Sequence, residues 1–450
     1  MEDKILSLAR RRGADAEVFA ERTTITRVTF QTDQGMSVNT KVVAGYGLRV
    51  IHRGRIGFAA TSNPARPELV VDAALEACRL GATARFEFPP AQPLPGVRLF
   101  NNRLALQPVE LMIASADEII ELARARLPGI QLGLNLEKRV GSLRVINTSG
   151  LDCSLDKTDY HLGLVGATSV GNRLISTTES ANLSSTPAAA RQAVERLIGR
   201  LSSTRQEAHL TPGRYPVIFA GSAVPSLLGP LFLALNGITL AQGRSPLADK
   251  EDEPVLDHNL TIFNDGLQDF GLGSAPFDGE GTPRRRLTLV ENGVLKNFLL
   301  DLTTAAQTGR QTTGCAQRDY RNPPQPGLSN LVIEPGAMQL ATALANIKEG
   351  LIVYEAEPCP PGDRACLETD ESVRPAPDAT TGDFVLTVKL GLKVEQGEFT
   401  GWLSGPVLSG NIFRLGRDLV GIGARQDDLL WALVPFLHVS DVAVEPQGKE

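Results

Sequence analysis

The run PVIFAGSAVPSLLGPLFLALNGITLAQG, residues 216–243, contains no acidic, basic, histidine or cysteine residue. Spanning a membrane takes ~20 mostly apolar residues without strong helix breakers. Five breakers interrupt this run: Pro225, Gly229, Pro230, Asn236 and Gly237. We therefore expect a buried strand over residues 215–220, then a turn and a helix, all in a soluble core. Ser222 or Ser226 is expected to cap the helix, and Pro230 to kink it or to mark a later start.

Length and composition narrow the class of protein. The chain has 450 residues, a net charge of −6 and a pI near 5.6. Chains beyond ~250–300 residues usually divide into domains, so we expect two, residues 1–207 and residues 208–450. The acidic balance does not favour nucleic acid or an anionic membrane as a partner. The first residues lack a basic segment followed by an apolar one, so we expect no signal peptide and a cytoplasmic protein.

Hydrophobic periodicity predicts both helices and strands along the chain. In the first domain it predicts a short opening helix over residues 2–12 and three further helices, with strands between the second and the third of these. These helices span residues 67–80, 108–127 and 187–201. Thr186 is expected to cap the third helix. The second domain is expected to be mostly strands. Arg53-Gly54 and Asn292-Gly293 each separate two apolar runs, which is typical of β-hairpins.

Residues 356–380 are rich in proline and acidic residues and are expected to form a surface loop. This segment carries Cys359 and Cys366, two of the five cysteines of the chain. An odd number of scattered cysteines in a long chain does not indicate a disulfide scaffold. No histidine or further cysteine flanks the two, so a zinc site is not indicated. We expect an exposed, mobile pair of thiols.

Motifs for common enzyme chemistry are absent from the sequence. None of the five histidines is followed by glutamate, and no two have the spacing of metal ligands on one helix. The chain has no Gly-x-Ser-x-Gly nucleophile elbow, no phosphate-binding loop and no Gly-x-Gly-x-x-Gly fingerprint. The sequence thus carries no signature of a single-helix zinc site, a serine hydrolase or a nucleotide-binding protein.

Two groups of acidic residues remain as candidates. The first consists of Asp249, Glu251, Asp252, Glu253 and Asp257. A hard-cation site is conceivable there, but a charge run is usually a solvated loop, which is what we expect. The second is Asp278 with Glu280, in a glycine-containing turn that enters the predicted second-domain hairpin. Turn chemistry is the favoured interpretation, and a paired-carboxylate acid/base site is the alternative.

Three separated groups of segments together resemble one family. The first is GYGLRV at residues 45–50 with RIGFAATS at residues 55–62. The second is PFDGEGTP at residues 276–283 with ENGVL at residues 291–295. The third is TGDF at residues 381–384, VEQGE at residues 394–398 and GPVLSGNI at residues 405–412. In order and spacing, and over nearly the whole chain, these segments resemble the TldD/PmbA family, also described as "modulator of DNA gyrase" proteins.

The resemblance implies a two-domain α+β dimer of the bacterial or archaeal cytosol, in which each domain has a largely antiparallel sheet packed by helices. In this family one subunit type carries a His-Glu-x-x-x-His zinc motif and a later cysteine ligand. The other type, PmbA or TldE, lacks these ligands and pairs with the first, and the pair trims unfolded peptides. In this chain the motif window falls on residues 229–234, with Gly229, Pro230 and Ala234 in place of the ligands, and no cysteine follows Gly423. Residues 229–234 are thus a vestigial zinc-helix position, and the chain resembles the PmbA/TldE type.

The resulting hypothesis is a PmbA/TldE-like subunit of a cytosolic metallopeptidase complex that processes unfolded peptides. No catalytic residue or metal is assigned to this chain. Zinc is expected on a TldD-like partner in a heterodimer, and a homodimer is the other possible assembly. Backbone that contacts an extended peptide is assigned to Thr381, Gly382, Asp383, Phe384, Gly410 and Asn411. Two alternatives stay open: a self-sufficient hydrolase with an unrecognised site, and a non-enzymatic binding protein that modulates a topoisomerase or another regulator.

Overall fold

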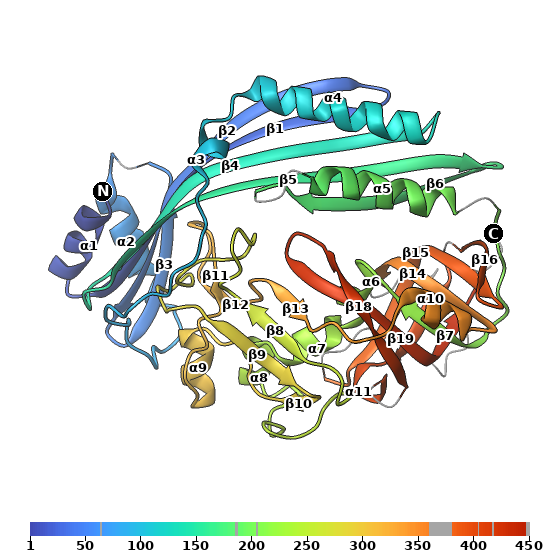
Figure 1. Cartoon of the computed structure of the whole chain (residues 1–450). Helices are drawn as coiled ribbons and strands as arrows, with labels where there is room; N and C mark the ends of the chain where they lie inside the picture. Colours follow the sequence, from blue (N-terminus) through green and yellow to red (C-terminus); the bar gives the residue numbers. More distant parts are fainter. Residues whose placement is uncertain are drawn as a thin grey trace.

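The computed structural model describes residues 1–63, 65–184, 188–203, 206–359, 380–403, 405–415 and 418–446. Its strands form two large sheets and one two-stranded ribbon, and most strand pairs are antiparallel. The predicted α+β class is therefore confirmed. Figure 1 shows the long strands of the first sheet extending over the second sheet. We call residues 1–203 the N-terminal region and residues 206–446 the C-terminal region.

The first sheet has six antiparallel strands in the order β3-β2-β1-β4-β5-β6. They are β1 (Asp15–Gln31), β2 (Gly35–His52), β3 (Arg55–Thr61), β4 (Gln131–Asn147), β5 (Asp152–Val170) and β6 (Arg173–Asn182). Tight turns fix the register between neighbours. In the turn from β2 to β3, Arg53 and Gly54 both have positive φ, at 51° and 75°. This is the geometry of a type I′ hairpin turn, so the predicted hairpin is confirmed.

Helices cover the apolar face of the long strands. The helices of this region are α1 (Glu2–Arg11), α2 (Pro67–Ala77), α3 (Asn102–Leu106), α4 (Val109–Arg126) and α5 (Ala189–Ser202). α4 and α5 share one core with the strands, in which Met112, Leu136, Leu162 and Leu197 are fully buried. α1 and α2 pack together in a second core at the other end. The three predicted helices are confirmed to within three residues at each end, and the predicted cap, Thr186, lies outside the described residues.

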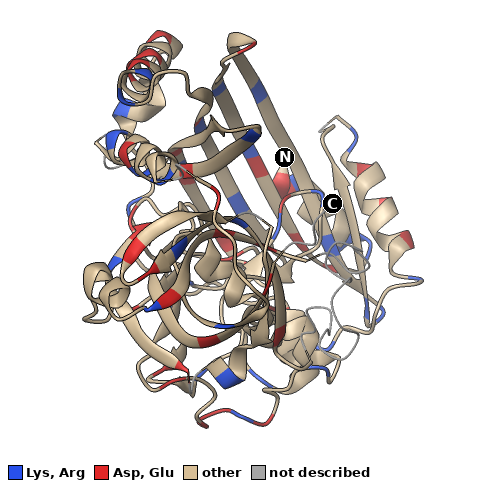
Figure 2. Cartoon of the chain, turned by 90° about the vertical axis from the view of Figure 1, so that its right-hand side faces the viewer, with Lys and Arg blue, Asp and Glu red and all other residues tan. Residues whose placement is uncertain are grey.

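The opposite face of the same strands is charged, because successive side chains alternate across a strand. Glu137 on β4 accepts hydrogen bonds from Arg27 and Arg139, and His161 Nε2 lies 3.8 Å from the same carboxylate. Figure 2 shows basic and acidic residues alternating along these strands. This part of the first sheet is therefore amphipathic, with Leu136 and Leu162 toward the helices and the Glu137 cluster on the other side.

Five strands of the second sheet close into a ring, because β7 pairs with both β14 and β19, and β15 and β17 join these two. The ring strands are β7 (Gly213–Phe219), β14 (Glu349–Pro358), β15 (Asp383–Glu395), β17 (Val407–Asn411) and β19 (Ala432–Glu445). β16 (Glu398–Leu403) pairs with β15, and β18 (Leu419–Asp428) pairs with β19. Ring closure occupies both edges of β7 and so protects it from pairing with other chains.

A smaller arm extends the second sheet from β19. It consists of β13 (Leu331–Ile333), β8 (Ile262–Asp265), β9 (Arg286–Glu291) and β10 (Val294–Leu295), and the separate ribbon is β11 (Ala316–Gln317) with β12 (Gln325–Pro326). Asn292 and Gly293 both have positive φ in the turn from β9 to β10, which confirms that hairpin. Three short helices complete the region: α9 (Leu302–Thr308), α10 (Leu340–Ala345) and α11 (Ile412–Leu415).

The uncharged run forms the inner core of the C-terminal region. It continues from β7 into α6 (Ala223–Leu227), α7 (Gly229–Ala234) and α8 (Gly237–Ala241), and α6 packs against four of the ring strands. Val217, Phe219 and Leu231 are fully buried, so the predicted buried strand and helix are confirmed. Pro230 stands in the first turn of α7, where its missing N–H is not needed. It therefore marks a new helix start.

The predicted serine cap of this helix is wrong. Ser222 precedes α6, but its side chain makes no capping hydrogen bond. Its Oγ donates instead to the carbonyl oxygen of Tyr354 at 3.2 Å, and Ser226 Oγ donates to that of Ala356 at 2.7 Å. Both hydroxyls therefore tie α6 to β14. Within the described part of the chain, no helix is both long and apolar enough to cross a membrane.

Gly47 allows β2 to pass directly against the C-terminal region. A Cβ atom at this position would lie 2.6 Å from the carbonyl oxygen of Tyr320. Because a backbone oxygen cannot turn aside, we expect Gly47→Ala to lower the free energy of unfolding by about 1–3 kcal/mol. On β5, the nearest atoms to a Cβ at Gly163 lie 4.0 Å away. Gly163→Ala should therefore change the free energy of unfolding by less than about 0.5 kcal/mol. Chemical denaturation of both variants tests this, and equal losses would contradict it.

Candidate binding site between the two regions

Four charged side chains from distant parts of the sequence meet where the two regions touch. Arg49 Nη1 donates to Glu280 Oε1 at 2.6 Å, and Arg49 Nη2 donates to Glu17 Oε2 at 3.1 Å. Arg318 Nη1 donates to the other oxygen of Glu17 at 2.6 Å. All four side chains are at most 2% exposed. This junction network joins β1 and β2 to the C-terminal region by charge-assisted hydrogen bonds away from water.

Aromatic rings surround the two arginines of the junction network. The Arg49 Cζ atom lies 5.0 Å from the ring centroid of Phe86 and 5.2 Å from that of Phe88. The Arg318 Cζ atom lies 4.6 Å from the ring centroid of Phe19. Guanidinium groups stack favourably on aromatic faces. The rings therefore hold both guanidinium groups in place, although the Nε atoms of Arg49 and Arg318 are buried without a hydrogen-bond partner.

Asp278 closes its own turn, as predicted. Its Oδ1 accepts the N–H groups of Glu280 at 2.9 Å and Thr282 at 3.0 Å, and its Oδ2 accepts that of Ala316 at 3.0 Å. The second oxygen of Glu280, Oε2, accepts the first N–H of α9 at 2.7 Å. Every oxygen of the two carboxylates is occupied, and both side chains are buried. This geometry leaves neither carboxylate free to reach a substrate, so it does not favour a paired acid/base site.

Burial raises the pKa of both carboxyl groups, to about 6 for Asp278 and about 8 for Glu280, because desolvation disfavours the charged form. The ordinary pKa of a glutamate is 4.5. Between pH 4.5 and about pH 8, Glu280 binds more protons in the folded chain than in the unfolded chain. The free energy of unfolding therefore falls as the pH rises through this range. Glu280→Gln should therefore lose less stability than wild type between about pH 5 and about pH 8.5. Urea denaturation at a series of pH values measures this difference, and parallel curves would refute it.

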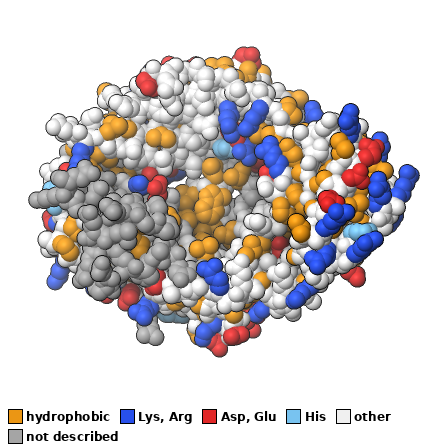
Figure 3. All heavy atoms as spheres, turned by 180° about the vertical axis from the view of Figure 1, so that it is seen from behind, with side chains coloured by type: hydrophobic (Ala, Val, Ile, Leu, Met, Phe, Trp, Pro, Cys, Tyr) orange, Lys and Arg blue, Asp and Glu red, His pale blue; other side chains and the backbone are white. Residues whose placement is uncertain are grey.

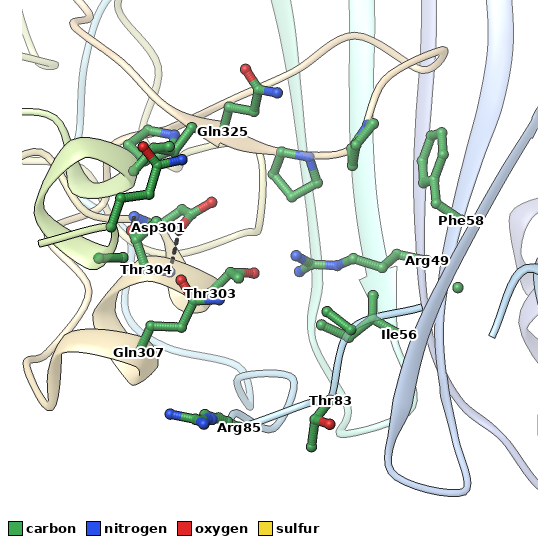
Figure 4. A pocket seen from close by; sticks show the side chains of 18 residues that line it. Arg49, Ile56, Phe58, Thr83, Arg85, Asp301, Thr303, Thr304, Gln307 and Gln325 are labelled. Atoms are coloured by element: carbon green, nitrogen blue, oxygen red, sulfur yellow. Dashed lines mark hydrogen bonds between the residues drawn. The ribbon is translucent and has the colours of Figure 1, made fainter. Parts of the chain in front are cut away.

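A cavity of about 880 Å³ lies beside the junction network, within the ~300–1,000 Å³ typical of ligand sites. Arg49, Ile56 and Phe58 form its wall on the first sheet. The facing walls come from α8, α9 and residues 323–326. Figure 4 shows Arg49 pointing across this space toward Asp301 and Thr303. We call it the junction cavity. From behind, the molecular surface is also hollowed near its centre, with hydrophobic side chains in the depth (Figure 3).

The vestigial zinc-helix position coincides with α7. Pro230 and Ala234 are buried, and Gly229 is half-buried. The leucines around them, Leu228, Leu231 and Leu235, are fully buried. Among the described residues, no group of three or more His, Cys, Asp or Glu side chains is placed to hold a metal ion. As it stands, α7 contributes packing to the C-terminal core.

The six residues assigned to peptide contact lie together, away from the junction cavity. They sit where β15 begins and β17 ends, with Asp383 opposite Asn411 and Phe384 opposite Gly410. Asn411 Nδ2 donates to the carbonyl oxygen of Thr381 and to Asp383 Oδ1, both at 2.7 Å. Phe384 is buried, and a Cβ atom at Gly382 would meet the ring of Phe413. The ladder between β15 and β17 uses much of this backbone, and its contact with a peptide stays a prediction.

The acidic run between residues 249 and 257 is a solvated loop, as predicted. Asp249 and residues 251–253 are exposed. Glu251 pairs with Arg310 at 3.1 Å, and Asp252 pairs with Lys296 at 2.8 Å. Asp257 is half-buried and accepts the N–H of Asn259 at 2.8 Å. Exposed ion pairs contribute little stability, and this arrangement leaves the run as surface structure.

The expectation of an exposed thiol is wrong for Cys359. Its side chain is 6% exposed, packs against Val385 and Val407, and is disulfide-bonded. The N–H of Cys359 donates to the carbonyl oxygen of Val385 at 3.0 Å, so the chain follows β15 for one residue beyond β14 and carries the sulfur inward. Cys366 and most of the predicted loop lie outside the described residues.

Sequence reasoning missed Glu17, Arg49 and Arg318 as site residues. Glu17 and Arg49 lie on strands and Arg318 directly follows β11, and no catalytic or metal-binding motif marks them. The contacts Arg49–Glu280 and Arg318–Glu17 join positions 231 and 301 residues apart. One signal was available: Arg49 lies in the GYGLRV segment, and Glu280 lies in PFDGEGTP. Two of the segments that carry the family resemblance therefore meet at the junction network.

The fold and these motifs define a protein of the metallopeptidase-related α+β class. Residues 212–446 match the description "PmbA/TldA metallopeptidase C-terminal domain", and residues 16–78 match "PmbA/TldA metallopeptidase domain 1". The chain belongs to the PmbA/TldD family.

Proteins similar to this chain come from both bacteria and archaea. The metalloprotease PmbA of Escherichia coli O157:H7 is 25% identical over 446 residues, which cover 93% of this chain and 89% of that protein. An uncharacterized protein of Methanocaldococcus jannaschii is 26% identical over 335 residues, which cover 74% and 78%. The crystal structure of TldE from Thermococcus kodakarensis superimposes with a TM-score of 0.86 at 20% identity, over 98% of this chain and 99% of that chain. The last similarity establishes the shared fold.

Proposed function

We propose that this chain is the non-catalytic, PmbA/TldE-like subunit of a cytosolic metallopeptidase complex that processes unfolded peptides. Its partner is a TldD-like subunit that holds the zinc ion. The proposal rests on the resemblance that places the zinc motif on α7, with Gly229, Pro230 and Ala234 at the positions of its residues, and on the burial of that helix. Catalytic zinc needs ligands that face an open coordination position, whereas Pro230 and Ala234 face the core.

The turn that carries Asp278 and Glu280 supports the same proposal. Asp278 and Glu280 have their oxygens occupied by hydrogen bonds within the chain, so they act as structural acceptors. Relatives of this chain are named metalloproteases. A subunit that keeps the family fold but has lost the metal ligands fits a supporting role in such an enzyme.

The first test uses the purified chain alone. Elemental analysis should find well below one zinc per chain, and the chain should not cleave an unfolded fluorogenic peptide when zinc is supplied. A family member that carries His-Glu-x-x-x-His, purified in the same way, serves as the positive control. Chelator-sensitive cleavage by the lone chain would overturn the proposal.

A further inference from the structure

We propose that the junction cavity binds a carboxylate group of a peptide, with Arg85 as its counter-ion. The inference rests on the proposed function, because it names the substrate feature that this subunit would hold. The cavity lies between β2–β3 of the N-terminal region and α8–α9 of the C-terminal region. A chain bound there would contact both regions at once.

The lining of the cavity matches the chemistry of a peptide. Ile56, Phe58 and Ile238 provide apolar walls, and Thr303 and Gln307 on α9 provide uncharged donors and acceptors. Sites for small ligands and short peptides usually combine apolar walls with a few such groups. Side-chain amides and hydroxyls satisfy backbone N–H and C=O groups without regard to sequence, which suits a site for varied peptides.

The charges around the cavity single out Arg85. Arg49 is matched by Glu17 and Glu280. Asp301 also lines the cavity, and at the start of α9 its Oδ1 accepts the N–H and the hydroxyl of Thr304, both at 2.7 Å. Arg85 is exposed, and within the described part of the chain it has no ion pair.

Arg85 is also placed to act on a ligand in the cavity. Figure 4 shows it below the space, on the same side as Gln307 of α9. Behind the wall, Arg49 is nine-tenths or more buried and its Nε atom has no hydrogen-bond partner. An exposed arginine without an ion pair in the described part of the chain favours an anionic group, and carboxylate is the anionic group that peptides carry.

Fluorescence anisotropy with three labelled peptides of one sequence tests the proposal. One ends in a free carboxylate, one in an amide, and one is an amide with a glutamate near its end. We expect the wild-type chain to bind the free-carboxylate peptide, the glutamate peptide or both about tenfold more tightly than the plain amide. The ranking of the first two distinguishes a chain end from an acidic side chain.

Three variants test which residues produce the preference for a carboxylate. Arg85→Gln should abolish the preference for carboxylate, and because Arg85 is exposed the fold should persist. Gln307→Leu should weaken all three peptides by a similar factor of a few. Arg126→Gln, at an exposed arginine on the outer helix α4, is the matched control and should leave the preference intact.

Two results overturn the inference. One is equal affinity for the carboxylate and amide peptides, or no binding of any of them. The other is a carboxylate preference that survives in Arg85→Gln. Either result leaves the proposed function standing, because that proposal is decided by zinc content and cleavage, which do not depend on Arg85.

Discussion

Arg49→Met is expected to lower the free energy of unfolding by about 3–5 kcal/mol, because it leaves buried carboxylates without their cation. Arg49 donates to both Glu17 and Glu280 inside a region closed to water. Its loss leaves Glu17 with Arg318 alone and removes the charge-assisted bond of Glu280. It also removes the stacking of the guanidinium on Phe86 and Phe88. Denaturation by urea, followed by fluorescence and circular dichroism, measures the loss.

Two further variants separate burial of charge from loss of a side chain. Arg126→Met, on the exposed side of α4, should change the free energy of unfolding by less than about 0.5 kcal/mol. Glu280→Gln added to Arg49→Met should recover part of the loss, because a neutral amide removes the cost of either burying an unpaired carboxylate or protonating it. An Arg49→Met variant as stable as wild type would show that the junction network does not hold the two regions together.

The second large effect is expected on α7, where Pro230→Glu combined with Ala234→His places the glutamate and one histidine of the zinc motif back in the motif window. Both positions are buried, and Ala234 is fully enclosed. A carboxylate and an imidazole there meet Leu231 and Leu235 rather than water, and they also exceed the space that a proline and an alanine leave. We expect a loss of more than about 3 kcal/mol from buried polar groups and overpacking together, and no gain of zinc.

The matched control lies on the same helix. Leu233 is 48% exposed, so Leu233→His should alter the free energy of unfolding by less than about 1 kcal/mol. Thermal unfolding and elemental analysis of both variants make the comparison. A double variant that is as stable as Leu233→His and binds one zinc per chain would mean that α7 can still form a zinc site. The interpretation of α7 as a core element would then be wrong.

Local features of the fold were predictable because local chemistry determines them. Asn292-Gly293 specifies a hairpin through two positive φ angles, and Pro230 specifies a helix start through its missing N–H. The absence of charge over residues 216–243 predicted burial, since no side chain there needs water. In contrast, closure of the ring depends on β7 pairing with residues 437–444 of β19, and no pattern within either strand encodes that choice.

The candidate site was predictable only in part for the same reason. The sequence placed Asp278 and Glu280 in a turn, and the turn geometry followed. It did not indicate that Glu280 meets Arg49, because an arginine on a strand is usually exposed and its neighbours across 231 positions are unknown from one sequence. Cys359 shows an error in the opposite direction. Its segment is rich in proline and acidic residues, so its side chain was expected to be exposed. One further residue of strand pairing buries the sulfur instead.

The most direct test of the central claim is the zinc content and peptidase activity of this chain with and without a His-Glu-x-x-x-His relative. The two are coexpressed, and the complex is isolated through a tag on this chain. We predict about one zinc per pair, chelator-sensitive cleavage of an unfolded peptide by the pair, and neither zinc nor cleavage when this chain is isolated alone. Stoichiometric zinc and cleavage in the lone chain, or no association with the zinc-bearing relative, would contradict the account.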